Sequence, residues 1–171
     1  MNVTYRKASE DDTDSIIAFV KNAIKVLDSQ GIFQWDDIYP TREDFACDIS
    51  KGEAFVAEVA CGKNKSIAAV FTLNTECDEE YKDGAWKYSG DNFIVIHRLC
   101  VNPEFQHKGL GAQICTHIID EARQNGKKAI RLDAFSKNPF SLKMYEKLGF
   151  CTVGTADWRK GRFFLMEKAI L

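Results

Sequence analysis

The stretch that decides the fold is VNPEFQHKGLGAQ, residues 101–113. It follows an apolar, strand-like run, FIVIHRLCV at 93–101, and leads into a helical pattern that we expect over 108–125. Two glycines, Gly109 and Gly111, stand at the start of that helix. A helix N-terminus leaves backbone N–H groups without helical partners and carries partial positive charge, so it attracts anions. The stretch therefore predicts an anion site or, in its simpler interpretation, a tight strand-to-helix turn.

Composition limits the class of protein. The chain has 171 residues, of which 45% are hydrophobic and 28% charged, and its formal net charge is -2. This length predicts one domain over 1–171, since single domains usually have ~100–200 residues. The lack of a basic surplus disfavours nucleic acid as a partner. Because we find neither a signal-like apolar region nor a run of ~20 apolar residues, we expect a cytoplasmic protein with no membrane partner.

The cysteines and histidines do not form the spacing of a metal site. The six cysteines contain no C-x-x-C pair, and several fall inside strand or helix patterns, so we expect free thiols and no zinc. The three histidines also lack close paired spacing. The residues concerned are Cys47, Cys61, Cys77, Cys100, Cys115 and Cys151, with His97, His107 and His117.

Strand and helix periodicities alternate along the chain. Strands alternating with helices in the second half predict a parallel crossover, and hairpins on either side predict antiparallel pairing. The expected fold class is α/β, with a mixed antiparallel and parallel sheet flanked by helices. The expected strands are 3–8, 53–60, 65–76, 93–101, 128–135, 151–157 and 161–170, and the expected helices are 9–31, 41–52, 108–125 and 139–148.

Two motifs in the second half carry a family resemblance. The run Gln106 to Gly111, QHKGLG, matches Q/R-x-x-G-x-G/A, whereas a Rossmann fingerprint would need a glycine where Ile114 stands. The later run LDAFSKNPFSLKMYEKLGF, Leu132 to Phe150, resembles N-x-x-x-x-x-x-Y-x-x-x-G-F. With both motifs in this order, the chain resembles the GCN5-related N-acetyltransferases, the GNAT family.

The resemblance implies a GNAT-like acyl-CoA N-acyltransferase fold and acetyl-CoA, a coenzyme A thioester, as the cofactor. In that family the pantetheine arm lies beside the strand that corresponds to 93–101, and the pyrophosphate lies on the glycine motif. The cofactor-binding residues implied are Leu99, Cys100, Val101, Gln106, His107, Lys108, Gly109, Leu110, Gly111, Ala112, Asn138, Ser141 and Tyr145.

The resemblance also implies that Tyr145 protonates the departing thiolate. A phenol with an ordinary pKa of ~10 can donate to a thiolate whose conjugate acid has a pKa of ~8.5. The simpler interpretation is an aromatic side chain that packs between Ser141 and Gly149. Asn138, followed by Pro139, also predicts a helix N-cap with proline at the first helical position.

The base that accepts the amine proton is a separate question. Family members often carry a glutamate where this chain has Val95, and arylalkylamine acetyltransferases carry a histidine where it has His97. A period of two places His97 on the same strand face as Val95 and Leu99. A neutral imidazole is a competent base, although a strand histidine can equally be hydrogen-bonded in the core.

The acceptor residues are expected in the first half of the chain. The loop GIFQWDDIYP, 31–40, offers Trp35 and Tyr39 beside two carboxylates, and Trp86 supplies a further wall. Aromatic rings and carboxylates suit an organic cation, so we expect a small-molecule amine, namely a small cationic amine or polyamine, as acceptor. The alternatives are a peptide or protein amine, a non-catalytic acyl-CoA sensor, and a solvated acidic loop with no acceptor role. The resemblance also allows a homodimer.

Overall fold

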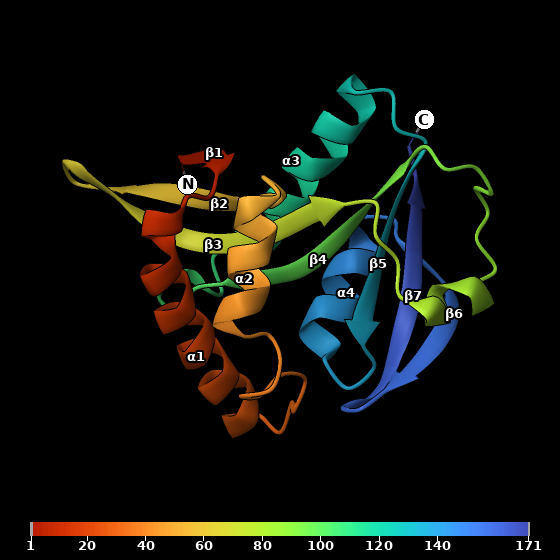
Figure 1. Ribbon diagram of the computed structural model, residues 1–171, viewed down its shortest axis with the longest axis horizontal. Coiled ribbons are helices and arrows are strands. Elements are labelled where there is room, and N and C mark those ends of the chain that lie inside the picture. The colour runs from red at the N-terminus through yellow and green to blue at the C-terminus, as the bar shows by residue number, and fades with distance from the viewer. Residues whose placement is uncertain (1, 171) are drawn as a thin grey trace. The chain divides into compact units, whose positions relative to one another are not determined.

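The computed structural model describes residues 2–170 (Figure 1). Contacts divide this part of the chain into two compact units. The first unit holds residues 2–73 together with Arg98–Gly111, and the second holds Asn74–His97 together with residues 112–170. The chain therefore crosses between the units after Leu73, after His97 and after Gly111.

The first unit is built from three antiparallel strands and two helices. Strand β1 pairs with β2, and β2 pairs with β3 through the hairpin that the sequence predicts around residues 62–64. Helix α2 starts with a capping box in which Thr41 and Asp44 exchange hydrogen bonds. The elements are β1 (Val3–Lys7), η1 (Glu10–Asp12), α1 (Thr13–Ser29), α2 (Arg42–Ser50), β2 (Ala54–Cys61), β3 (Asn64–Asn74) and η3 (Pro103–Phe105).

The core of the first unit joins both helices to the sheet. Phe19 and Val20 on α1 belong to one buried cluster with Phe45 on α2, Val56 on β2 and Val70 on β3. Full burial of such a side chain contributes about 1.5–3 kcal/mol. The apolar stripe that the sequence predicts on the first helix is therefore its core face, and it holds the helix against the strands.

A partly buried ion pair between Arg6 and Asp12 stabilises the start of α1. The Asp12 carboxylate accepts hydrogen bonds from Arg6 Nη1 at 2.7 Å, from Arg6 Nη2 at 2.9 Å and from the Ser9 backbone N–H at 2.7 Å. The hydrogen bonds from Arg6 lower the pKa of Asp12 to about 2, against the opposing effect of burial. The carboxylate is therefore ionised whenever the protein is near neutral pH.

The second unit contains the remaining strands and the helix that carries the second motif. Strand β7 pairs antiparallel with both β5 and β6, as predicted for the C-terminal hairpin. Its elements are η2 (Glu79–Asp83), β5 (Ala129–Phe135), α4 (Pro139–Lys147), β6 (Cys151–Trp158) and β7 (Gly161–Ala169). Figure 1 shows α4 beside β5, and contacts join the two elements.

Two elements contribute to both units. Strand β4 (Phe93–Val101) supplies its first half to the second unit, where it pairs in parallel with β5 from Phe93–Ala129 to Ile96–Leu132. Helix α3 (Leu110–Gln124) begins in the first unit and continues in the second. The strand order over the described residues is β1-β2-β3-β4-β5-β7-β6. The predicted mixed α/β sheet, with its parallel crossover and flanking antiparallel pairs, is confirmed.

The start of α3 differs from the prediction. The helix begins at Leu110 rather than at Lys108. His107 and Gly109 have φ angles of 60° and 76°, in the left-handed region that a right-handed helix excludes. The turn therefore includes Lys108 and Gly109, which the periodicity assigned to the helix.

The thiols of all six cysteines are free, as predicted. Cys100 and Cys115 are buried, and burial raises the pKa of each to about 12. Across residues 2–170, no cluster of three or more His, Cys, Asp or Glu side chains has the arrangement of a metal site. Over the same residues, no helix combines the length and apolar character needed to cross a membrane.

Candidate functional site

Two hydrogen bonds hold the segment that leads into the glycine turn, residues 106–109. Asn102 Oδ1 accepts from the Glu104 backbone N–H at 3.2 Å and starts η3, and Gln106 Nε2 donates to the Val101 carbonyl at 3.0 Å. Gly109 then adopts φ +76°, and a Cβ placed there would meet no atom within 4 Å. Leu110, the first residue of α3, is buried and anchors the helix start. The turn thus leads into a helix N-terminus with open space in front of Gly109.

The basic side chains of the turn do not both face its glycines. Lys108 Nζ donates to the Glu104 carbonyl at 3.0 Å and lies 5.6 Å from the centroid of the Phe105 ring. His107 is exposed. In this structure the positive character at the start of α3 therefore comes mainly from the backbone N–H groups of the helix.

The predicted pantetheine strand lies beyond the β4–β5 ladder. The last pair of that ladder is Ile96–Leu132, so Leu99, Cys100 and Val101 follow it. Cys100 points into the core of the first unit, whereas Leu99 and Val101 are half-buried. The backbone from Leu99 to Val101 is thus outside the parallel pairing that holds the first half of β4.

Arg98 is a residue of this region that the sequence interpretation missed. Its φ is 50°, a left-handed conformation inside a strand. Its Nε and Nη2 donate to the Asp48 carboxylate at 2.8 and 2.6 Å, and its Nη1 donates to Tyr39 Oη at 2.9 Å. Thr72 Oγ1 donates to the same carboxylate at 2.7 Å. An arginine inside the apolar run FIVIHRLCV is the sequence signal that could have revealed this cluster.

The Arg98–Asp48 pair is largely out of water. The side chains of Arg98 and Asp48 are only 15% and 6% exposed. Burial alone would lower the pKa of Arg98, but Tyr39 and Asp48 outweigh burial and leave that pKa above its ordinary value. The cluster therefore carries a permanent, compensated charge pair next to the loop predicted to bind the acceptor.

The loop at 31–40 turns one predicted acceptor residue inward and one outward. Trp35 is only 9% exposed and belongs to the hydrophobic core of the first unit. Asp36 Oδ1 accepts from the backbone N–H groups of Ile38 and Tyr39, at 3.0 and 3.3 Å, so this carboxylate shapes the loop. The large side chains that face outward are Phe33, Ile38 and Tyr39. The loop therefore presents Phe33, Ile38 and Tyr39 together with one exposed carboxylate, Asp37.

His97 lies at the end of the second unit's part of β4. Its Nε2 is 3.1 Å from the carbonyl oxygen of Glu76, and the residue is half-buried. The alternation of faces that placed Val95, His97 and Leu99 together applies only up to His97, because the left-handed Arg98 interrupts the pleat.

Tyr145 is buried on α4 in the second unit. Its ring packs edge-on against Phe150, with centroids 5.6 Å apart. Burial raises the pKa of Tyr145 well above 10, and the nearby Cys115 and Asp133 act in the same direction. The phenol is therefore protonated throughout the neutral range, which is the state that a proton donor requires.

The start of α4 follows the sequence prediction. Asn138 is the N-cap, its Oδ1 accepts from the Ser141 backbone N–H at 3.2 Å, and Pro139 stands at the start of the helix. Ser141 Oγ donates back to the Asn138 carbonyl at 3.2 Å. These bonds fix the orientation of the helix turn that precedes Tyr145.

A second buried tyrosine was also missed. Tyr81 Oη donates to Asp133 Oδ2 at 2.8 Å, and burial followed by Asp133 raises the pKa of Tyr81 well above 10. The last pair of the β4–β5 ladder is Ile96–Leu132. His97 and Asp133 each follow that pair by one residue, on β4 and β5 respectively. No local pattern links residues 81 and 133, because they come from separate elements.

Trp86 has extensive contacts inside the second unit. Its Nε1 donates to the Tyr81 carbonyl at 2.7 Å. The Arg131 guanidinium lies 4.3 Å from the Trp86 ring centroid and 3.9 Å from that of Phe93. Glu167, buried beside Arg131, accepts from the Lys87 backbone N–H at 2.8 Å. The segment at 77–92 is thus bound to the sheet, and these contacts favour a structural role for Trp86.

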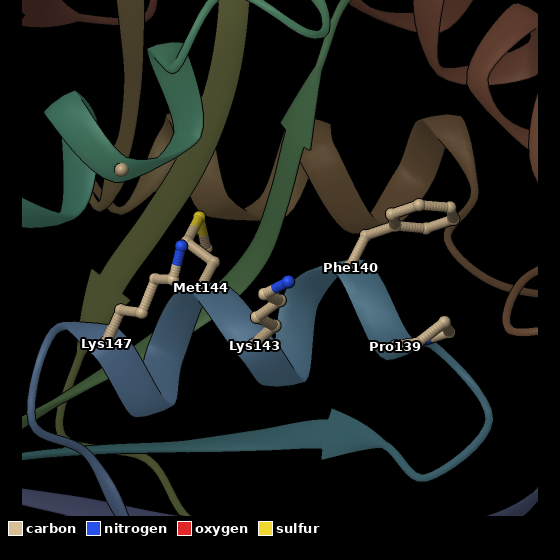
Figure 2. A pocket seen from close by; sticks show the side chains of 6 residues that line it. Pro139, Phe140, Lys143, Met144 and Lys147 are labelled. Atoms are coloured by element: carbon tan, nitrogen blue, oxygen red, sulfur yellow. The ribbon is translucent and has the colours of Figure 1, made fainter.

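An open pocket lies along one side of α4 in the second unit (Figure 2). Its volume is about 470 Å³. Figure 2 shows Phe140, Lys143, Met144 and Lys147 along the helix, with Pro139 at the end of the row. The residues that line the pocket are Ala112, Pro139, Phe140, Lys143, Met144 and Lys147.

Comparison with known families agrees with both sequence motifs. The model of the Acetyltransferase (GNAT) family matches residues 22–150. The chain belongs to the GNAT family. The matched range includes the loop at 31–40, the glycine turn and the whole of α4, so the elements described above fall within the family domain.

Two relatives illustrate the similarity in sequence. The L-methionine sulfoximine/L-methionine sulfone acetyltransferase of Salmonella typhimurium is 37% identical over 68 residues, which cover 39% of this chain and 40% of that relative. The chain thus spans about two fifths of that relative's length in the match. The uncharacterised N-acetyltransferase YesJ of Bacillus subtilis is 28% identical over 163 residues, 94% of this chain and 86% of the relative.

Solved structures show the same fold. A GNAT family acetyltransferase from Streptococcus agalactiae superposes with a TM-score of 0.83 at 23% identity, covering 98% of this chain and 95% of that one. The structure of yncA from Salmonella typhimurium with its cofactor acetyl-CoA gives a TM-score of 0.68 at 19% identity, covering 100% and 95%. At these identities the likeness establishes the fold.

Proposed function

We propose that this protein is an N-acetyltransferase that transfers the acetyl group of acetyl-CoA to a primary amine. The observation that carries the proposal is the glycine turn, in which left-handed Gly109 leaves open space before the N-terminus of α3. Such a terminus suits a diphosphate group. Membership of the GNAT family and the yncA structure with acetyl-CoA support the choice of this thioester. We expect residues 1–171 to act as one domain.

The cofactor roles are proposed residue by residue. The backbone N–H groups from Gln106 to Ala112 would bind the pyrophosphate, and the backbone of Leu99 to Val101 would bind the pantetheine arm as an added strand. The position of Leu99 to Val101 beyond the last β4–β5 pair supports the second role, because their backbone groups are not used by that ladder. Asn138 and Ser141, ordered by their mutual hydrogen bonds, would contribute side-chain contacts.

The proposed reaction is a direct attack by the amine. The amine nitrogen forms a bond to the thioester carbonyl carbon, and the carbon–sulfur bond breaks with its electron pair remaining on sulfur. Tyr145 donates its phenolic proton to that sulfur, and His97 accepts a proton from the amine nitrogen. Tyr145 carries its proton near neutral pH because burial raises its pKa, so its hydroxyl is available to donate to the sulfur.

We propose a small-molecule acceptor, but one that is more apolar than the polyamine expected from the sequence. In the loop, Asp36 accepts hydrogen bonds from the loop backbone, which leaves Asp37 as the one exposed carboxylate of residues 31–40, whereas a polyamine carries several cationic groups. The exposed Phe33 and Ile38 favour an amine with an apolar portion. Since the Salmonella relative acetylates methionine sulfoximine and methionine sulfone, we propose an amino acid or a related amine.

The test is an assay for thiol release from acetyl-CoA with a panel of amines. The panel contains apolar amino acids, polyamines, arylalkylamines and short peptides. We expect amine-dependent release of CoA, with the highest kcat/KM for an amino acid. Release with peptides alone would move the acceptor to the peptide class, and binding of acetyl-CoA without release for any amine would favour a sensor.

A matched pair of variants tests the cofactor site. Gly109→Glu places a carboxylate where the pyrophosphate is expected, and we predict that it abolishes binding of acetyl-CoA. Gly126→Glu is the control, because Gly126 has a similar φ of 68° and equally open space, beyond the other end of α3. Undiminished binding by Gly109→Glu, measured by calorimetry, would contradict the proposed pyrophosphate site.

A further inference from the structure

The guanidinium of Arg98 has more hydrogen-bond donors than its protein partners use. A guanidinium carries five N–H groups, and the Asp48 carboxylate accepts from two of them, one on Nε and one on Nη2. Tyr39 Oη accepts from a third, on Nη1, at 2.9 Å. Within residues 2–170 no other group accepts a hydrogen bond from this side chain. One N–H group therefore remains on each of the two terminal nitrogens.

The cluster has an inner side and an outer side, both within the first unit. Asp48 is almost completely buried, so its contact with Arg98 lies inside the protein. Tyr39 is exposed, and its ring centroid lies 5.9 Å from Arg98 Cζ. The Arg98 side chain keeps a small exposed fraction. The terminal nitrogen that contacts Tyr39 is therefore on the outer side of the cluster.

Stability alone does not explain an arginine at this position. A buried ion pair is often no more stabilising than an apolar pair of similar volume. Arg98 also holds a left-handed backbone conformation, which costs free energy and is common at binding sites. Its partner Asp48 is fixed in turn by the hydrogen bond from Thr72. The cluster therefore holds one guanidinium in a defined orientation, as a binding site requires.

The loop that supplies Tyr39 is the loop expected to bind the acceptor. Ile38 directly precedes Tyr39, and Phe33 lies in the same loop, with both side chains exposed. Two N–H groups on the terminal nitrogens of a guanidinium match the two oxygens of a carboxylate. The first unit thus offers a fixed cation for a carboxylate and exposed apolar side chains for the rest of a small molecule.

We propose that Arg98, oriented by Asp48 and Tyr39, binds the carboxylate of an amino acid acceptor through its two terminal nitrogens. The proposal rests on the proposed acetyltransferase function and makes its acceptor more specific. Arg98 determines specificity and takes no part in the bond changes. An amine without a carboxylate would lose this contact, and so would a peptide, whose first residue has an amide group in place of the carboxylate.

The experiment compares leucine and methionine with leucinamide and methioninamide in the assay for thiol release from acetyl-CoA. Each amide keeps the side chain of its amino acid and lacks the negative charge. With kcat/KM expressed per concentration of neutral amine, we expect the wild type to prefer the amino acids at least about tenfold. The preference should come mainly from a lower KM, because the carboxylate contact is present before the reaction begins.

Arg98→Lys removes the pair of terminal nitrogens but keeps a cation beside Asp48. We expect it to bring the preference close to one. The matched control is Arg6→Lys, because Arg6 belongs to the same unit and also binds a carboxylate, that of Asp12. This control should keep the wild-type preference. Since the preference is a ratio, a loss of folded protein lowers both rates equally and does not change it.

A second variant tests the site if Arg98→Lys does not fold. Tyr39→Phe removes the oxygen that accepts from Nη1 and keeps the ring, so the guanidinium is less well oriented. We expect the preference to decrease about three- to tenfold. Tyr5→Phe, the same change on β1 in the same unit, is the control and should keep the wild-type preference. Circular dichroism and the Tm of each variant establish that it is folded.

The outcomes separate this proposal from the proposed function. Equal values of kcat/KM for amino acids and amides in the wild type would overturn the carboxylate site and leave the acetyltransferase proposal standing. A wild-type preference in folded Arg98→Lys, or its loss in Arg6→Lys as well, would do the same. An unchanged preference in Tyr39→Phe would overturn the role of Tyr39. If no amine of any class gave release of CoA, both proposals would be overturned.

Discussion

Replacement of Asp48 by asparagine should destabilise the protein strongly. The substitution keeps the size of the side chain and its ability to accept from Thr72, but it removes the negative charge that faces Arg98 at 2.6 and 2.8 Å. Breaking a buried ion pair from one side usually costs about 3–5 kcal/mol, because a charge remains buried without compensation. Arg98 keeps its hydrogen bond to Tyr39 and some exposure, so we expect a cost near the lower limit, about 3 kcal/mol.

Urea denaturation and thermal unfolding would measure this cost. For a chain of this length, about 3 kcal/mol corresponds to a decrease in Tm of roughly 6–12 °C. Asp157→Asn is the matched control, because Asp157 also pairs with an arginine, Arg162, at 3.0 Å, but both side chains are mostly exposed. We expect that control to have a Tm close to that of the wild type.

A double variant distinguishes the buried charge from other effects of the substitution. If the cost comes from the uncompensated guanidinium, Asp48→Asn/Arg98→Met should be more stable than Asp48→Asn by at least about 1 kcal/mol. Should Asp48→Asn retain the wild-type stability within about 1 kcal/mol, or should the double variant be the less stable of the two, the assignment of this pair as a buried, charged cluster is refuted.

Three further predictions concern single titratable side chains. Because the pKa of Asp12, about 2, lies below the ordinary 3.8, its pairing with Arg6 should stabilise the fold fully above about pH 4 and progressively less as the pH falls towards 2. Asp12→Asn should therefore cost about 2 kcal/mol at neutral pH, and the Tm difference from wild type should shrink in acid. Tyr145→Phe should lower kcat by about 100- to 10,000-fold with little change in the acetyl-CoA dissociation constant. If this variant kept the wild-type kcat, Tyr145 would be excluded as the general acid. His97→Ala should flatten the acidic limb of the kcat/KM profile, whereas an unchanged limb would assign that limb to the amine or to water.

Local sequence patterns predicted most of the elements. The apolar run FIVIHRLCV and the apolar stripe of the first helix each depend on residues close in the chain, and they appear as β4 and α1. The N-cap at Asn138 is likewise a local property, since its partner is Ser141. The error at the start of α3 has a backbone cause, because the left-handed conformation of Gly109 is set by the turn and not by hydrophobic periodicity.

The features that were missed depend on residues far apart in the sequence. Arg98 and Asp48 are separated by 50 positions, and Tyr81 and Asp133 by 52. One sequence contains no pattern that links such pairs. The same limit explains the loop at 31–40, where composition predicted a cation site but Trp35 is in the core. A long-range partner decides whether a polar or aromatic side chain faces a ligand or the protein interior.

The route of the chain between its two units has a practical consequence for fragment studies. Each unit is assembled from two separate stretches, so neither is encoded by one continuous piece of the gene. A fragment that ends at Leu73 would lack the second half of β4 and the glycine turn, and the complementary fragment would carry both without the strands and helices of the first unit. Expression of isolated halves is therefore expected to yield unfolded material. For a split-protein reporter or a circular permutant, the new chain ends are better placed at the exposed hairpin tip near Gly62. The two strands on either side of this tip, β2 and β3, both belong to the first unit.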